Sequence, residues 1–294
     1  MPPARPSRGH DGVYGVLGHR IEHSQSPALF RRVFDALGWE AVYARFDLPP
    51  HRLAPFLRAC ADTGVAGFSI TAPYKTCAMP HLDQVDRVAA TIGAVNAVAV
   101  RRGVLLGFNT DVVGVHASLR PCGRVLHGKE AVIFGAGGAA RAVVWVLAHK
   151  FGMARITVVA RSTRRARRWF PARADRRSSA AVDISPWRRE EIRRALGTAA
   201  LVINATPLGS GRLAGRSPLP RGVRIPARCI VFDLAYRPRP SVLLKQARQD
   251  GCRFCFDGWT MLVAQAEASF RIWTGRSFPP AVRRTLLIEG LGND

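Results

Sequence analysis

The chain carries the stretch AVIFGAGGAARAVVWVL at residues 131–147. A short apolar run, a glycine turn and then apolar residues at helical spacing predict a strand, a phosphate-binding loop and a helix. Gly135 allows the tight turn, Gly137 lets the backbone approach a pyrophosphate, and the helix N-terminus holds the anion. The same glycines would also suit a turn that binds nothing. The candidate cofactor-binding residues are Gly135, Ala136, Gly137, Gly138 and Ala139.

The next strand decides between these two interpretations. It is expected at residues 156–159, where an NAD-binding fold would end the strand with an acidic residue for the ribose 2′-hydroxyl. The strand is followed here by Ala160, Arg161 and Ser162, and then by Arg164 and Arg165. A guanidinium binds a 2′-phosphate, which a carboxylate would repel. The sequence therefore predicts NADP, although Arg164 or Arg165 taken singly would equally suit a solvated helix start.

Composition bounds the class of protein. The 294 residues are 48% hydrophobic and 22% charged, which predicts a soluble globular protein large enough for two domains. The sequence shows no apolar run long enough for a membrane span and no signal-peptide core, so we expect a cytoplasmic location and no membrane partner. The six cysteines have no framework spacing, and Cys252 and Cys255 form an isolated C-x-x-C for which we expect no metal.

The net charge of +24 raises the question of nucleic-acid binding. Arginines are spread along the whole chain, and no nucleic-acid motif or aromatic platform accompanies them. We therefore expect salt-sensitive, nonspecific adhesion to polyanions but no specific nucleic-acid partner.

The first half of the chain alternates expected strands and helices, which predicts a mainly parallel sheet. Residues 1–12 are expected to be a disordered lead-in, and residues 13–18 a strand. Ser26 before Pro27 predicts a helix N-cap, with Gly38 ending the helix. Ser24 has no such structural role, so the two hydroxyls are candidates to bind a ligand carboxylate together.

Polar residues follow the later strands of this half. Lys75 lies beyond the strand expected at 66–71, at the sheet edge where α/β proteins bind ligands, although an exposed lysine is the simpler interpretation. A helix is expected around residues 82–90. Asn96 inside an apolar strand is either a structural hydrogen-bonding residue or a ligand contact. Thr110 or Asp111 suits the cap of a helix over 112–119.

In the second half, Asn204, Ala205 and Thr206 close the strand at 201–203 and face the cofactor crevice if the strand order is the usual one. Tyr236 lies just past the strand at 229–234. Helices are expected at 259–273 and 281–289, with Gln265 in the first of them; its local interpretation is a solvent-facing side chain.

Taken together, these segments resemble the shikimate dehydrogenase family, in the family's order from about Tyr14 to about Leu287. The matching motifs are His-Ser-x-Ser-Pro at 23–27, Thr-x-Pro-x-Lys at 71–75, Gly-Ala-Val-Asn at 93–96, Asn-Thr-Asp at 109–111, Gly-Ala-Gly-Gly-Ala at 135–139, Asn-Ala-Thr at 204–206, the segment of Tyr236, and 261–266.

The resemblance implies a substrate-binding α/β domain at 13–115, a Rossmann NADP-binding domain at 116–257 and C-terminal helices at 258–294 that return to the first domain, with the chemistry in the cleft between the domains. It implies reversible NADPH-dependent reduction of 3-dehydroshikimate to shikimate by a monomer or homodimer. The carried-over residues are the catalytic pair Lys75 and Asp111; Ser24, Ser26 and Tyr236 for the substrate carboxylate; Thr71, Asn96 and Gln265 for the ring hydroxyls; and Gly258 and Met261 for the cofactor.

Three departures from the family pattern concern substrate selectivity. Ser69 replaces the usual Asn, Val112 replaces Gly, and Trp259-Thr260 replaces Leu-Gly. The alternatives are a quinate/shikimate dehydrogenase of broader specificity and a basic nucleic-acid-binding relative without catalysis. The presence of both Lys75 and Asp111 argues against the second.

Overall fold

The computed structural model describes residues 12–170 and 178–289. They divide into two compact units: unit 1 comprises residues 12–110 and 265–289, and unit 2 comprises residues 111–264. The predicted α/β class is confirmed, and unit 2 is an insertion in the chain of unit 1. The predicted lead-in lies outside the described residues except for Gly12.

Unit 1 is built on a six-stranded sheet in the order β2-β1-β3-β5-β6-β4. Strand β1 runs parallel to β2 and β3, β4 runs parallel to β6, and β5 is antiparallel to β3 and β6. The bounds are β1 Val13–Gly18, β2 Val42–Asp47, β3 Val65–Ile70, β4 Gln84–Val85, β5 Ala97–Arg101 and β6 Val104–Phe108.

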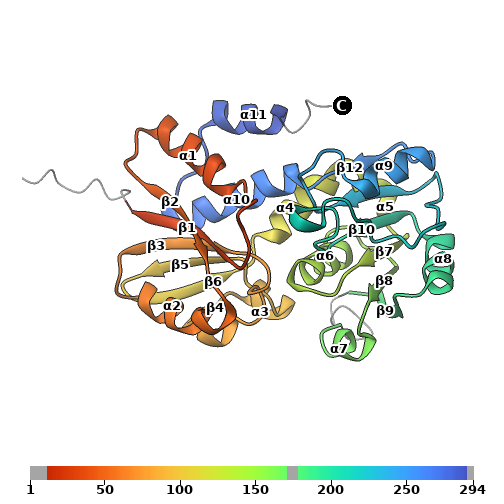
Figure 1. Cartoon of the computed structure of the whole chain (residues 1–294), viewed down its shortest axis with the longest axis horizontal. Helices are drawn as coiled ribbons and strands as arrows, with labels where there is room; N and C mark the ends of the chain where they lie inside the picture. Colours follow the sequence, from red (N-terminus) through yellow and green to blue (C-terminus); the bar gives the residue numbers. More distant parts are fainter. Residues whose placement is uncertain (1–11, 171–177, 290–294) are drawn as a thin grey trace, which may run out of the picture. The chain divides into compact units, whose positions relative to one another are not determined.

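Helices cover both faces of this sheet. Helices α1 (Ser26–Leu37) and α11 (Pro280–Glu289) lie on one side, and α2 (Leu53–Cys60) and α3 (Arg87–Ile92) on the other (Figure 1). The second half of α10 (Trp259–Thr274) joins α1 through an aromatic cluster, in which Phe30 contacts Phe270, Trp273 and Phe278 at ring distances of 5.5 to 6.4 Å. This core therefore joins the two ends of the chain.

Unit 2 has the sheet order β12-β11-β10-β7-β8-β9, with every pair of neighbours parallel. This is the doubly wound arrangement of dinucleotide-binding domains, whose order reverses between the first and fourth strands, here β7 and β10. The bounds are β7 Glu130–Phe134, β8 Arg155–Ala160, β9 Ala181–Pro186, β10 Leu201–Asn204, β11 Ile230–Asp233 and β12 Cys255–Phe256.

Two hydrophobic cores cover the faces of this sheet. One contains buried residues of α4, α5 and α6, and the other contains residues of α8 and α9. The helix bounds are α4 Asp111–Leu119, α5 Gly123–Leu126, α6 Gly138–His149, α7 Thr163–Arg167, α8 Arg189–Thr198 and α9 Val242–Gln249, and 3₁₀ turns occur at Pro50–Arg52, Met79–His81, Arg120–Cys122 and Gly211–Leu213. No helix in the described ranges is long and apolar enough to cross a membrane.

The helix expected around residues 82–90 is wrong. Residues 84 and 85 form β4, which pairs with β6, and the helix begins only at Arg87. The carboxylate of Asp86 accepts hydrogen bonds from the backbone N–H groups of Val88 and Ala89 at 3.2 and 2.9 Å. Asp86 is thus the N-cap, and its capping bonds fix the start of α3.

Candidate active site

Ser24 and Ser26 lie at the start of α1, but the predicted N-cap role of Ser26 is wrong. Ser26 is the first helical residue, and Gln25 holds the cap position without a side-chain capping bond. The hydroxyl of Ser24 accepts a long hydrogen bond of 3.4 Å from the Ser26 N–H, and Arg45 donates to the Ser24 carbonyl at 3.0 Å. These bonds fix the loop that carries both hydroxyls.

Both serines are buried, at 7% and 6% exposure. The Ser26 hydroxyl makes no hydrogen bond to any residue that the structure describes. The hydroxyl oxygen itself is not among the fully enclosed side-chain atoms that lack a partner in the described residues. Capping does not account for Ser26, so its hydroxyl remains a candidate ligand contact.

Lys75 lies in a loop that follows β3. The neighbouring Tyr74 is 1% exposed, and its hydroxyl donates to the Leu48 carbonyl at 2.5 Å. The Lys75 carbonyl accepts a 2.7 Å bond from the N–H of Val95, and the carbonyl of Thr71 accepts from the N–H of Tyr74 at 2.9 Å. These contacts hold Thr71 and Lys75 at the carboxyl end of β3, beside the residue that precedes Asn96.

Asn96 lies just before β5 and not inside the strand, and it is 2% exposed. Its side-chain oxygen accepts from the Thr110 N–H at 2.6 Å, and its amide nitrogen donates to the Thr110 hydroxyl at 3.0 Å and to the Gln265 oxygen at 3.4 Å. Asn96 is thus at least a structural hydrogen-bonding residue that joins β5, the end of β6 and α10.

Gln265 is buried at 8% exposure, so its solvent-facing interpretation is wrong. The next turn of α10 adds Ser269, whose hydroxyl lies 3.0 Å from that of Thr110 and donates to the Gln265 carbonyl at 2.9 Å. Asp111 follows directly as the first residue of α4 and is 2% exposed. Thr110, for which the sequence predicts only a capping role, is the centre of this polar cluster.

The glycine turn of unit 2 has the geometry expected for a phosphate loop. Gly135 has φ +108°, and a Cβ there would lie 3.0 Å from the Ala205 carbonyl oxygen, so a side chain is excluded. Among the residues that the structure describes, a Cβ on Gly137 would meet nothing within 4 Å and no side chain caps the N-terminus of α6. The first backbone N–H groups of α6 are therefore left for an anion.

Asn204, at the carboxyl end of β10, organises the neighbouring loop. Its side-chain oxygen accepts from the N–H and hydroxyl of Thr206 at 3.0 and 2.7 Å, and its amide nitrogen donates to the carboxylate of Asp233 at 2.9 Å. The Ser241 hydroxyl donates to the other carboxylate oxygen at 2.6 Å. Burial raises the pKa of Asp233 to about 6. Asp233 was not identified from the sequence, although an acidic residue at the end of an apolar strand could have pointed to it.

Tyr236 and Trp259 meet edge to face, with ring centroids 6.3 Å apart. A Cβ on Gly258 would overlap the Leu234 carbonyl oxygen, so this glycine is required for the close approach of two backbone segments. Met261 is 7% exposed and packs in the core of unit 2.

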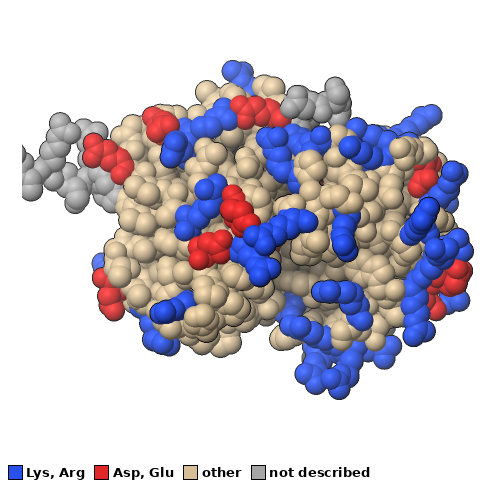
Figure 2. All heavy atoms as spheres, viewed as in Figure 1, with Lys and Arg blue, Asp and Glu red and all other residues tan. Residues whose placement is uncertain are grey.

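The candidate 2′-phosphate residues lie around the start of α7. Ser162 is its N-cap and accepts from the Arg165 N–H at 3.3 Å, so this hydroxyl has a structural role as well. Arg161, Arg164 and Arg165 are exposed. Blue spheres gather over α7 in Figure 2, as expected from its basic residues.

The C-x-x-C pair has no unusual thiol chemistry. Burial raises the pKa of Cys252 to about 12 and also raises that of Cys255. Cys252 donates weakly to the Pro226 carbonyl, and Cys255 to the Cys252 carbonyl. Both thiols are therefore protonated at neutral pH and poorly reactive.

The family models and the curated relatives that match this chain agree on one family. Residues 16–98 match the model described as the shikimate dehydrogenase substrate binding domain, and residues 258–287 match the shikimate 5′-dehydrogenase C-terminal domain. The chain is 39% identical to shikimate dehydrogenase (NADP(+)) of Symbiobacterium thermophilum, over 97% of this chain and 96% of the relative, and 39% identical to that of Methanopyrus kandleri, over 95% and 96%. The crystal structure of shikimate 5-dehydrogenase from Thermus thermophilus, in complex with NADP(H) and shikimate, matches with a TM-score of 0.77 and 33% identity, over 95% of this chain and 99% of that one.

Proposed function

We propose that this chain, which belongs to the shikimate dehydrogenase family, reduces 3-dehydroshikimate reversibly to shikimate with NADPH. It is thus an NADP-dependent oxidoreductase acting on a CH–OH group, in the shikimate pathway that leads to aromatic amino acids. The matched relatives span almost the whole chain, which supports carrying the complete reaction over.

The residues of unit 2 fit the cofactor. The uncapped N-terminus of α6 and the open side of Gly137 suit a pyrophosphate, and the basic segment of α7 suits a 2′-phosphate. Bound NADPH supplies the hydride. The other proposed cofactor contacts are Asn204, Ala205 and Thr206 at the end of β10, and Gly258 and Met261 near the start of α10.

Lys75 and Asp111 are the proposed acid–base pair. This assignment rests on the main-chain connections of the two residues, which both lead to the neighbours Val95 and Asn96. The Lys75 carbonyl accepts from the Val95 N–H, and Asp111 is covalently next to Thr110, which is doubly hydrogen-bonded to Asn96. We propose that the Lys75 ammonium donates a proton to the substrate oxygen when that oxygen becomes negative, and that Asp111 orients the lysine.

The remaining polar residues are proposed to position the substrate. Ser24, Ser26 and Tyr236 bind the carboxylate, and Thr71, Asn96 and Gln265 bind the ring hydroxyls. Ser26 supports the first role, because the residue is only 6% exposed and its hydroxyl makes no hydrogen bond within the described ranges.

The direct test measures NADPH oxidation with 3-dehydroshikimate, and NADP and NAD reduction with shikimate and with quinate. We expect shikimate with NADP to give the highest kcat/KM. Quinate turnover at a similar kcat/KM would favour the broader enzyme, and no turnover of any substrate would contradict the proposal. The monomeric or dimeric state and the cytoplasmic location stay predictions.

A further inference from the structure

Arg141 lies in the first turn of α6, just after the glycine turn, and is only 6% exposed. Its guanidinium carbon is 3.7 Å from the ring centroid of Trp169, which is close enough for a cation–π stack. A positive charge is therefore held inside unit 2, on the helix that opens at the candidate pyrophosphate loop.

Trp169 is itself held in place. It follows α7 and lies between Ala166 and Phe170, which are 1% and 5% exposed and belong to the core. The N–H groups of Trp169 and Phe170 both donate to the Ala166 carbonyl, at 2.9 and 3.1 Å. The main chain at Trp169 is consequently held in place, and its indole ring, which is 48% exposed, lies over the Arg141 guanidinium.

The starts of α6 and α7 lie at the same edge of the sheet. Strands β7 and β8 are paired with Phe134 opposite Val159, and the Gly135 N–H donates to the Val159 carbonyl at 2.9 Å. The loop after β7 and the basic segment after β8 therefore leave the sheet side by side. Burial, and then the positive charge of Arg165, lower the pKa of Arg141 to about 10, as expected for two cations at the same edge of the sheet.

We infer that Arg141 is a specificity-determining residue for NADP over NAD, because its buried positive charge stacks on Trp169 at the edge of the sheet where the basic segment of α7 begins. An adenosine 2′-phosphate offsets the repulsion between the two guanidinium groups, and it does so strongly because the Arg141 charge is buried. NAD has no group that does this. The inference rests on the proposed function, and it adds Arg141 to the exposed arginines of α7 as a residue that contributes to cofactor choice.

The test compares kcat/KM for NADP and for NAD in Arg141→Gln and Arg141→Lys enzymes, with shikimate as substrate. We expect Arg141→Gln to lower the NADP to NAD ratio at least about tenfold, the scale of one charge-assisted contact. The reaction with NAD and the KM for shikimate should stay near wild type. Arg141→Lys keeps a positive charge that can also lie over the Trp169 ring, and it should keep the ratio within about threefold of wild type.

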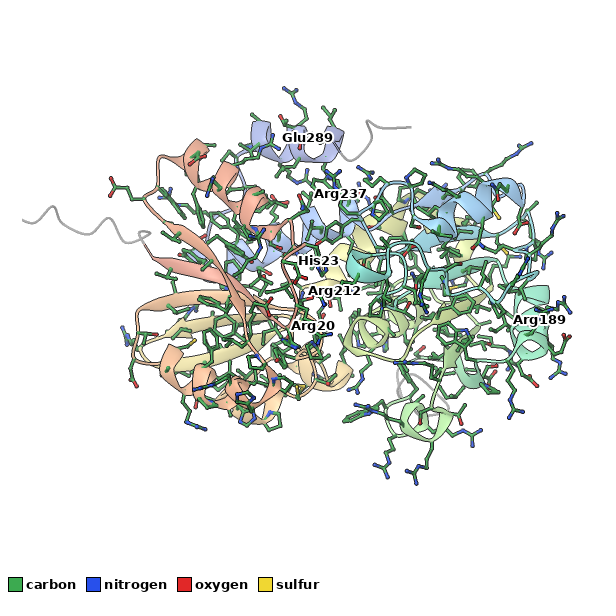
Figure 3. The ribbon with its side chains drawn as sticks, in the orientation of Figure 1. Arg20, His23, Arg189, Arg212, Arg237 and Glu289 are labelled. Carbon is green, nitrogen blue, oxygen red and sulfur yellow. The ribbon has the colours of Figure 1, made fainter. Side chains whose placement is uncertain are left out.

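Two outcomes would overturn the inference. An unchanged ratio in Arg141→Gln would remove the residue from cofactor choice, and an equal loss with both cofactors would reduce it to a structural role in α6. Arg189→Gln is the matched control, because this exposed arginine on α8 removes the same net charge from unit 2 and is expected to leave the ratio unchanged (Figure 3).

A binding measurement separates this inference from the proposed function and replaces kinetics if a variant is inactive. Calorimetry on the full chain with adenosine 2′,5′-bisphosphate and with adenosine 5′-monophosphate probes the 2′-phosphate without catalysis. We expect Arg141→Gln to weaken only the bisphosphate, by about tenfold. If Arg141→Gln does not fold, Trp169→Leu is the second variant, and an unchanged preference for the bisphosphate there would overturn the inference.

Discussion

At the scale of single residues, the proton for the substrate oxygen is expected from Lys75. Lys75→Ala should lower kcat at least about a hundredfold, which is the usual contribution of a general acid. The KM for NADP should stay near wild type, because the loop is held by Tyr74 and by the Lys75 main chain. Steady-state kinetics with both substrates check this.

Lys245→Ala is the control for Lys75→Ala, because Lys245 is exposed on α9 in unit 2. It should leave kcat unchanged. A Lys75→Ala enzyme that turns over shikimate at the wild-type rate would exclude Lys75 from the mechanism.

Asp233 makes stability depend on pH. Its pKa is about 6 in the folded protein and about 4 in an unfolded chain, so between these values only the folded state holds the proton. The free energy of unfolding therefore falls as the pH rises from about 4 to about 6, by on the order of 3 kcal/mol. Asp233→Asn removes this dependence.

Urea unfolding at pH 4 and pH 7 measures the Asp233 effect. From pH 4 to pH 7, the free energy of unfolding of Asp233→Asn should rise relative to that of the wild type by on the order of 3 kcal/mol. A difference that is the same at both pH values would show that burial does not control this carboxyl group.

The sequence indicated residues that follow strands, because ligand residues of α/β sheets lie there. Lys75 was singled out in this way as a candidate, and its role stays a prediction. The contacts of Thr110 and Arg141 could not be predicted, because their partners are distant in the sequence: Thr110 contacts Gln265 and Ser269, and Arg141 contacts Trp169. No local pattern carries that information.

At the scale of elements, a substitution at the start of α1 can distinguish a role in substrate binding from a role in helix stability. Ser26→Ala should raise the KM for shikimate about tenfold or more, because a hydrogen bond to a carboxylate is lost. It should leave the free energy of unfolding nearly unchanged, because Ser26 is not the N-cap. Kinetics and urea unfolding of the same variant check both parts, and a loss of stability of about 1 kcal/mol or more would contradict the second.

The junction between β11 and α10 is expected to accept only glycine. Gly258→Ala should destabilise the protein by about 1 to 3 kcal/mol or more, because its Cβ would overlap the Leu234 carbonyl. Gly197→Ala in α8 is the matched control, since its Cβ meets nothing within 4 Å and alanine favours a helix by about 0.5 to 1 kcal/mol. Thermal unfolding should therefore shift in opposite directions, and equal shifts would contradict this account.

Most strands could be located from the sequence to within one or two residues, because buried parallel strands are short apolar runs between turn residues. Strand β4, in the segment at 82–90, could not be located from the sequence, because it has only two residues and depends on pairing with β6. Helix α9 was also not predicted from the sequence. Its start depends on Ser241, whose hydroxyl accepts from the Leu244 N–H at 3.3 Å.

At the scale of the whole molecule, the aromatic cluster joins the two ends of the chain in unit 1. Phe270 is fully buried against Phe30 and Phe34. Phe270→Ala should cost about 3 to 5 kcal/mol of stability, whereas Phe254→Ala, at a residue that is 58% exposed, should cost little. Chemical denaturation measures both, and a small effect at Phe270 would mean that α10 contributes little to this core.

The insertion of unit 2 into unit 1 has a consequence for synthesis on the ribosome. Unit 2 ends at residue 264, so its whole chain is translated before Phe270, Trp273 and Phe278 emerge. The face of the first segment that packs on these aromatic residues is made first and has no such partner until they emerge. Translation therefore completes the cofactor-binding half before the substrate-binding half, and we expect the nascent first segment to expose apolar surface during that interval.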